Sequence, residues 1–295
     1  MKILWVVVSL VALVIYGFHQ YQKDSLQKAL DNAQWGYLIL AIIALVAAKT
    51  LLAALSREGC RSSGASISFW DILTLYSLTQ VGKYLPGGVW HFVSRGAAYR
   101  QRGLSATQIA RSLILENLWM FSAAASVAAF GFLLFRFDVL PLPTWTMIPM
   151  AFIVVSLYPA VIVVSLIFNR SDFKWKTVVT LTLIGLLAWL AIGAAFYLVV
   201  LACSLGHTGF IFAVTSFAAA WCAGFVVPFV PGGIGLREFA LIYLLQPALS
   251  EGEAFLASLL ARLVWTGGES LMVLLMVWTS RYSRRNGDAN NNSLE

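Results

Sequence analysis

The chain is short of charge. Only 11% of its 295 residues are Asp, Glu, Lys or Arg, whereas 60% are hydrophobic and the mean hydropathy is +0.82. A soluble globular domain carries roughly 25% charged residues, so this composition excludes that class and indicates an integral membrane protein. The net charge of +7 then reports orientation and contact with anionic headgroups, and we expect no nucleic-acid partner.

Residues that build metal and catalytic sites are also few. The histidines and cysteines are three each and scattered: His19, Cys60, His91, Cys203, His207 and Cys222. We interpret the cysteines as small apolar packing residues. The sequence contains no nucleophile elbow, no nucleotide-binding P-loop and no acidic pair at metal-ligand spacing. We therefore expect no metal, no cofactor and no enzymatic activity.

Long apolar runs dominate what is present. Six segments approach the roughly 20 residues that a membrane helix needs: 3–18, 36–55, 112–135, 145–168, 177–205 and 254–279. The first resembles a signal peptide but lacks a small-residue cleavage site, so we expect a retained helix. We expect one transmembrane domain over 1–283 and a disordered polar tail over 284–295.

The tripeptide Pro-Gly-Gly interrupts two further apolar segments, 67–99 and 210–245. It occurs at Pro86-Gly87-Gly88 and at Pro231-Gly232-Gly233, 145 residues apart. Such breaks free backbone groups, which membranes tolerate only where protein or water surrounds them. Transporters bind substrates and ions at helix ends of this kind. We interpret each segment as a re-entrant pair of short helices; a kink in one full span is the alternative.

The number of spans between the two breaks predicts the topology. Three predicted spans separate the hairpins, so they enter from opposite sides, as an inverted repeat with cores over 67–135 and 210–280. Of the 20 cations, four fall on one side (Lys23, Lys28, Arg136, Arg237), three fall within segments (Lys49, Lys83, Arg262) and the others share the second side. The positive-inside rule makes that second side cytoplasmic, with both termini, in a bacterial inner membrane.

Ionisable residues beside the breaks are the first functional candidates, because charge at membrane depth is costly. Lys83 precedes the first break, whereas Arg237 and Glu238 follow the second. Beside a helix N-terminus, such a cation would bind phosphate. The alternative is that Lys83 reaches the interface and Arg237 pairs with Glu238. A transferase that uses Glu116 or Glu238 as its base is the chemical alternative.

Other candidates lie in or after the first hairpin and in the long spans. Arg95 belongs to a basic cluster that either only sets orientation or forms a cytoplasmic vestibule for anionic headgroups. Glu116, Arg262 and Glu269 either form structural pairs, such as Glu116 with Arg262, or couple transport to protons or ion pairing. A lone His91 is either a packing residue or a ligand.

The candidate residues fall into two sets. The expected substrate-binding residues are Lys83, Tyr84, Pro86, Gly87, Gly88, His91, Arg95, Pro231, Gly232, Gly233, Gly235, Arg237 and Glu238. The expected coupling residues are Glu116, Asn117, Arg262 and Glu269.

Two motifs carry a resemblance to a known family. The segments GKYLPGGVWH at 82–91 and PGGIGLRE at 231–238 resemble the hallmark motifs of the lysylphosphatidylglycerol synthase transmembrane domain family, and the similarity extends over 36–279. In the two-part synthase of that family, an aminoacyl transferase domain follows the membrane domain, which is credited with flipping the aminoacylated lipid. No transferase domain follows here, so we expect a stand-alone form.

The resemblance implies a lipid translocase, or flippase, that moves an anionic phospholipid or a polyprenyl-phosphate glycolipid between leaflets. Two alternatives stay open: an intramembrane transferase acting on a lipid-linked substrate, and a non-catalytic scaffold of an envelope-biosynthesis complex. The expected partners are the membrane, such a lipid, and either a second copy of the chain or an envelope-biosynthesis enzyme.

Overall fold

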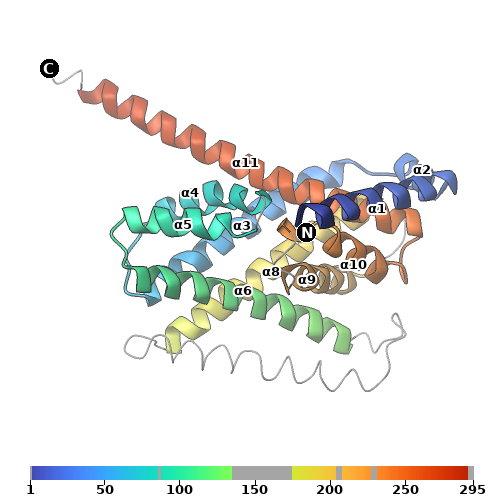
Figure 1. Cartoon of the computed structure of the whole chain (residues 1–295), viewed down its shortest axis with the longest axis horizontal. Helices are drawn as coiled ribbons and strands as arrows, with labels where there is room; N and C mark the ends of the chain where they lie inside the picture. The colour runs from blue at the N-terminus through green and yellow to red at the C-terminus, as the bar shows by residue number, and fades with distance from the viewer. Residues whose placement is uncertain (1, 86–87, 135–174, 204–207, 227–230, 292–295) are drawn as a thin grey trace.

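The computed structural model describes residues 2–85, 88–134, 175–203, 208–226 and 231–291, and its regular secondary structure in these ranges is helical (Figure 1). The all-α fold expected from the sequence is therefore confirmed for these ranges. The predicted span over 145–168 lies outside the described residues, as do Pro86 and Gly87.

Four described helices are long and apolar enough to cross a membrane. They are α3 (Gly36–Ser62), α6 (Ala106–Leu134), α8 (Trp175–Cys203) and the Glu251–Arg281 part of α11 (Glu251–Asn291). They coincide with the predicted spans over 36–55, 112–135, 177–205 and 254–279. Their 27 to 31 residues extend about 40–46 Å at ~1.5 Å per residue, which exceeds a hydrocarbon core of ~30 Å. The chain is a multi-pass membrane protein.

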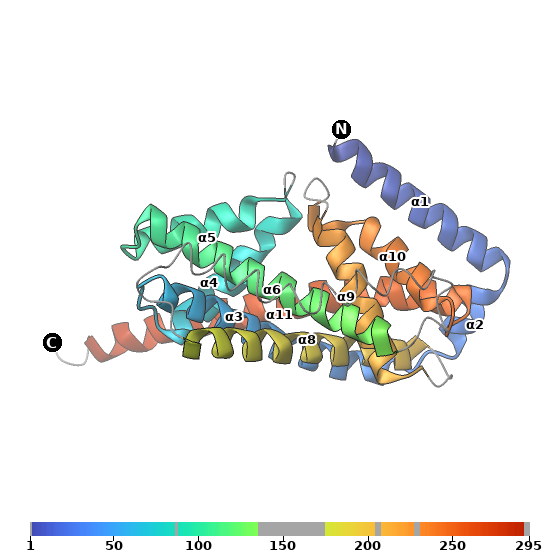
Figure 2. The same ribbon diagram turned by 90° about the horizontal axis from the view of Figure 1, so that it is seen from below.

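The predicted span over 3–18 lies within α1 (Lys2–Gln22), which is followed by the short α2 (Ser25–Asp31). α1 lies at one edge of the molecule (Figure 2). It is not among the four candidate spans, so its crossing stays a prediction. Its end is tied to the start of α11, because Gln20 donates a hydrogen bond to Glu251 at 2.7 Å.

The opposite end of α11 continues as helix to Asn291. This helix includes residues 284–291, for which composition predicts a disordered tail, whereas 292–295 lie outside the described ranges. In Figure 1 the C-terminal part of α11 extends beyond the body of the molecule.

Helix α8 is central to the packing, since it contacts α3, α6, α9 (Phe210–Val226) and α11. Small residues allow the backbone of α8 to lie close to its neighbouring helices. A Cβ added to Gly193 would lie 2.6 Å from a methyl group of Val214 on α9, and one on Gly185 would lie 3.3 Å from Ala123 on α6. Small residues at helix contacts are the usual means of close packing in membranes, because lipid offers no hydrophobic driving force between helices.

Each Pro-Gly-Gly segment separates two short helices that pack against each other. The first pair is α4 (Phe69–Gln80), continued by the 3-10 turn η1 (Val81–Tyr84), and α5 (Trp90–Gln101). The second is α9 and α10 (Leu236–Leu245), joined through η3 (Pro231–Gly233). In Figure 2 the two pairs lie toward opposite ends of the long helices. Their turns meet, because η1 contacts η3.

Glycine is required at both turns. Gly232, Gly233 and Gly235 have φ of 60°, 69° and 88°, a backbone region that side chains disfavour. At the first turn, a Cβ on Gly82 would lie 2.7 Å from the backbone nitrogen of His91. The glycines therefore let the chain reverse tightly and bring the start of α5 against η1.

Candidate functional site

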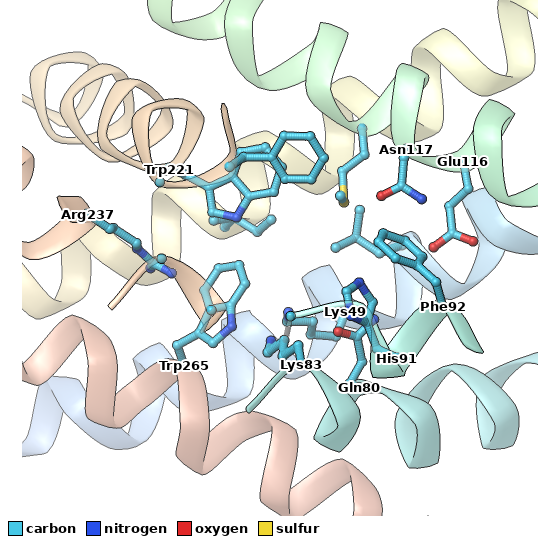
Figure 3. Close-up of a pocket in the computed structure, with 18 of the residues that line it drawn as sticks. Lys49, Gln80, Lys83, His91, Phe92, Glu116, Asn117, Trp221, Arg237 and Trp265 are labelled. Atoms are coloured by element: carbon cyan, nitrogen blue, oxygen red, sulfur yellow. The ribbon is translucent and has the colours of Figure 1, made fainter. Parts of the chain in front are cut away.

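A cavity of about 300 Å³ lies where the two turns meet (Figure 3). It is lined by both helix pairs and by α3, α6, α8 and α11. Ligand sites generally measure ~300–1,000 Å³, so this cavity lies at the small end of that range.

The structure brings most of the candidate residues to this cavity. Those that line it are Lys83, Gly88, His91, Arg95, Glu116, Asn117, Gly232, Gly233, Arg237 and Arg262. Tyr84, Glu238 and Glu269 bond to one another or to lining residues, and Gly235 bonds to Glu238. Pro86 and Gly87 lie outside the described residues, and Pro231 begins η3.

Arg237 is the buried cation whose environment most resembles an open binding site. Its side chain comes from the first turn of α10, only 5% of the residue is exposed, and it lines the cavity. Its guanidinium lies 4.5 Å from the ring centroids of both Phe217 and Trp265. Its Nη2 has no hydrogen-bond partner among the described residues. A buried charge is normally paired, so this nitrogen is available to a ligand.

Glu238, the neighbour of Arg237, forms an ion pair and a hydrogen bond instead of lining the cavity. One carboxylate oxygen accepts the backbone N–H of Gly235 at 2.7 Å, and the other lies 2.7 Å from Nη2 of Arg262. Arg262 also donates to the carbonyl of Gly232 at 3.0 Å. The pair Glu238–Arg262 therefore fastens the glycine turn to α11. The interpretation that Arg237 pairs with Glu238 is wrong.

Arg95 and Glu116 form a second buried pair, between α5 and α6. Glu116 also accepts a hydrogen bond from Ser56 at 2.7 Å, and Arg95 donates to Thr79 at 3.2 Å. Two expectations are thereby corrected. Glu116 does not pair with Arg262, and Arg95 is 1% exposed, so it is an interior residue that lines the cavity and not a surface cation.

The two pairs occupy the same place in their halves, with the charges reversed. Each joins the second helix of a short pair to the long helix that follows it. In the first half the cation, Arg95, is on the short helix, whereas in the second half the cation, Arg262, is on the long one.

Glu269 on α11 gathers three donors. Lys49 of α3 lies 2.6 Å from one carboxylate oxygen, Lys83 of η1 pairs with the same oxygen, and the hydroxyl of Tyr84 donates to the other at 2.8 Å. Lys83 therefore does not reach the membrane interface. Because one carboxylate serves two ammonium groups, this cluster keeps one positive charge in excess.

The cavity is positive overall. Five cations line it, namely Lys49, Lys83, Arg95, Arg237 and Arg262. The carboxylates that pair with them are three, namely Glu116, Glu238 and Glu269. In the described residues around the cavity, two positive charges thus lack a carboxylate.

Sequence reasoning missed Lys49 and the aromatic walls as site residues. Lys49 is a lone cation in an apolar span, which is the same signal that identified Arg262. Trp265 lies between Arg262 and Glu269 on one face of α11, and Trp221 stacks on Phe225 with ring centroids 4.8 Å apart. Aromatic lining residues have no comparable signal, because tryptophan in such a chain is expected mainly at the membrane interface.

Comparison with known families gives one finding. The family model described as the lysylphosphatidylglycerol synthase TM region matches residues 2–180. The matched part contains the first helix pair and α6, and it ends within α8. No curated protein matches the chain.

Proposed function

The chain belongs to the lysylphosphatidylglycerol synthase transmembrane family, and from that premise we propose that it is a lipid translocase for an anionic, phosphate-bearing headgroup. Family and fold support a membrane protein with a lipid-related function. One observation carries the finer proposal: Arg237 is buried and lines a net positive cavity, with a guanidinium nitrogen that no described residue satisfies.

A phosphate suits Arg237 for two reasons. A guanidinium offers a planar fork of donors that matches the geometry of phosphate oxygens. The cavity also has more cations than carboxylates. A phosphate that enters it therefore neutralises positive charge that no carboxylate balances. The unpaired charge of Arg237 in this interior costs free energy. Binding of the phosphate offsets that cost.

The proposed route follows from the position of the two turns. Each short helix pair is taken as a re-entrant hairpin, one from each side of the membrane, so that η1 and η3 meet at depth. With α1 and the span over 145–168, the chain would cross six times and hold both termini in the cytoplasm of a bacterial cell. The headgroup would cross through the cavity while its acyl chains stay in lipid.

The buried ion pairs are the proposed coupling elements. Arg95–Glu116 and Glu238–Arg262 each tie a short helix to a long one. Glu269 ties the first turn to both α3 and α11 through Lys83 and Lys49. A headgroup phosphate that competes for these cations would loosen one tie at a time and so change which side of the cavity opens.

Translocation is favoured over lipid chemistry by the state of the carboxylates. Glu116 and Glu238 are each bound to an arginine, and Glu269 is bound to two lysines and a tyrosine. A general base must be within reach of the proton that it abstracts, and these oxygens are already engaged. A scaffold role would not need the unpaired nitrogen of Arg237.

The test is transport by the purified protein in liposomes. Fluorescent phosphatidylglycerol is distributed over both leaflets, and an impermeant reductant destroys the fluorescence of the outer leaflet; a translocase exposes the remainder. We expect Arg237→Ala to lower the rate at least tenfold, because the unpaired donor for phosphate is lost. Arg61→Ala is the matched control, since the Arg61 side chain is 60% exposed and, among the described residues, pairs with Glu58 alone.

Several results would count against the proposal. Equal rates for Arg237→Ala and the parent protein would remove Arg237 from the transport path. A purified protein that chemically alters the lipid would favour the transferase. If the protein moves no lipid and a cellular phenotype survives Arg237→Ala, the scaffold reading is favoured.

A further inference from the structure

We propose that the headgroup carries an uncharged, hydroxyl-bearing unit on its phosphate, and that the cavity selects against headgroups bearing an amine. The inference rests on the proposed function and deepens it, because it names the chemistry at the far side of the phosphate. It follows from the excess of cations around Trp265 and from three neutral polar side chains that line the cavity away from Arg237.

The excess positive charge is gathered around one ring. Arg237 lies 4.5 Å from the Trp265 centroid, and the ammonium nitrogens of Lys49 and Lys83 lie 3.7 Å and 5.3 Å from it. The two lysines share a single carboxylate, and Arg237 has an unsatisfied nitrogen. We therefore place the phosphate beside Trp265 of α11.

Another wall of the cavity presents neutral hydrogen-bonding groups. Gln80, His91 and Asn117 line it and come from the ends of α4 and α5 and from α6. In Figure 3 these three lie on the side of the cavity away from Arg237, and Glu116, which lies beside Asn117, is already paired with Arg95. Asn117 uses its amide nitrogen to donate to the carbonyl of Leu113 at 2.8 Å, and no described residue donates a hydrogen bond to its side-chain oxygen.

His91 adds an unsatisfied buried atom at this wall. Its Nδ1 has no hydrogen-bond partner among the described residues. A hydroxyl can both donate and accept, so it can satisfy an amide oxygen, an amide N–H and an imidazole nitrogen alike. A phosphate bound at Trp265 with a polyol attached would place hydroxyls toward these groups.

The cavity offers no comparable binding site to an amine. An ammonium group needs acceptors and, when buried, a counter-ion. The three carboxylates at the cavity are held by arginine or lysine, and two cations remain in excess. The lipid in the family's name carries a lysine, whose two ammonium groups would be repelled here. The cavity of this chain therefore suits a polyol better than an aminoacyl headgroup.

The test compares lipids that differ only beyond the phosphate. The full chain in detergent is equilibrated with dioctanoyl phosphatidylglycerol, phosphatidylmethanol or phosphatidylethanolamine, and bound fractions are measured by native mass spectrometry. Phosphatidylmethanol has the same charge as phosphatidylglycerol but no hydroxyls. We expect phosphatidylglycerol to bind about tenfold more tightly than each of the other two, which corresponds to ~1.4 kcal/mol. A phosphatidylinositol arm distinguishes a sugar-like ring from glycerol.

Two variants locate the effect. Asn117→Leu and, on another helix, Gln80→Leu should each reduce the preference for phosphatidylglycerol over phosphatidylmethanol to less than threefold, because the hydroxyls lose a hydrogen-bonding partner. Gln27→Leu is the matched control, because Gln27 is exposed on α2 and its side chain bonds to Asp31 of the same helix and to no other residue in the described ranges. Thermal melting of each variant shows whether it is folded.

The outcomes separate this inference from the proposed function. Equal binding of phosphatidylglycerol and phosphatidylmethanol, with both lost in Arg237→Ala, would leave the phosphate site standing and overturn the polyol site. Phosphatidylethanolamine binding as tightly as phosphatidylglycerol would also overturn the selectivity. If no anionic lipid binds, both the inference and the proposed function fail.

Discussion

Reversing the buried pair Arg95–Glu116 tests how this membrane interior is held together. Both residues are almost fully buried, at 1% and 4% exposure, and each has a further polar partner in Thr79 or Ser56. Removing one member of a buried pair costs roughly 3–5 kcal/mol, because the other charge stays buried without compensation. We therefore expect Glu116→Gln and Arg95→Gln each to destabilise the protein by about that amount.

The double variant Arg95→Glu, Glu116→Arg restores opposite charges at the same place. It should recover at least half of the stability lost in the charge-reversing single variants Arg95→Glu and Glu116→Arg, although the bonds to Thr79 and Ser56 are not reproduced. Exposed pairs contribute only ~0–1 kcal/mol, so Arg61→Gln in the exposed pair with Glu58 is the matched control.

The assay is thermal or denaturant unfolding of the purified protein in detergent, read by tryptophan fluorescence. The reasoning is refuted if Arg95→Gln is as mild as Arg61→Gln, because a surface arginine of a cytoplasmic vestibule would behave in that way. It is also refuted if the double variant is no more stable than the less stable of its two parents, because the two charges would then not interact.

Two further predictions concern the turns and their anchor. Gly82→Ala should destabilise the protein by about 1–3 kcal/mol, because overpacking forces a shift and the new methyl group would meet backbone atoms of His91; Gly36→Ala, with nothing within 4 Å, should be nearly neutral in the same melting assay. Glu269→Gln should reduce the stability of the protein by roughly 3–5 kcal/mol, because it leaves two lysines without a carboxylate. Tyr84→Phe removes one hydrogen bond to a charged group and should reduce the stability by only about 1.5–3 kcal/mol. Equal melting temperatures for the two variants would contradict the assignment of Glu269 as the shared anion.

The sequence was sufficient to predict the helix pairs and most residues around the cavity. Proline and glycine in apolar segments mark breaks for local steric reasons, so 67–99 and 210–245 were correctly divided into short helices. Charges inside spans were also sound indicators, because lipid makes them costly. At the offset of 145 residues that separates the two tripeptides, Glu116 corresponds to position 261, next to Arg262.

Partners could not be predicted in the same way. Lys49 and Glu269 are 220 residues apart, and no local pattern indicates which helices will pack side by side. The position of Arg95 after the first break predicts a place at the cytoplasmic surface, but sequence spacing does not say which turn of α5 leaves the interior. Arg237 and Glu238 are adjacent, yet successive helical residues point in different directions, so one lines the cavity and the other fastens the turn.

The opposite polarity of the two interhelical ties also bears on how the chain assembles. If the first short pair docked on α11 instead of α6, Arg95 would face Arg262; if the second docked on α6, Glu238 would face Glu116. Like charges brought together in such an interior cost several kcal/mol, so each wrong docking is penalised. Two halves that share a tripeptide and a similar helix order are thereby prevented from exchanging places, within one chain or between two neighbouring copies during insertion. The reversed charges therefore favour docking of α5 on α6 and of α10 on α11 over the exchanged arrangement.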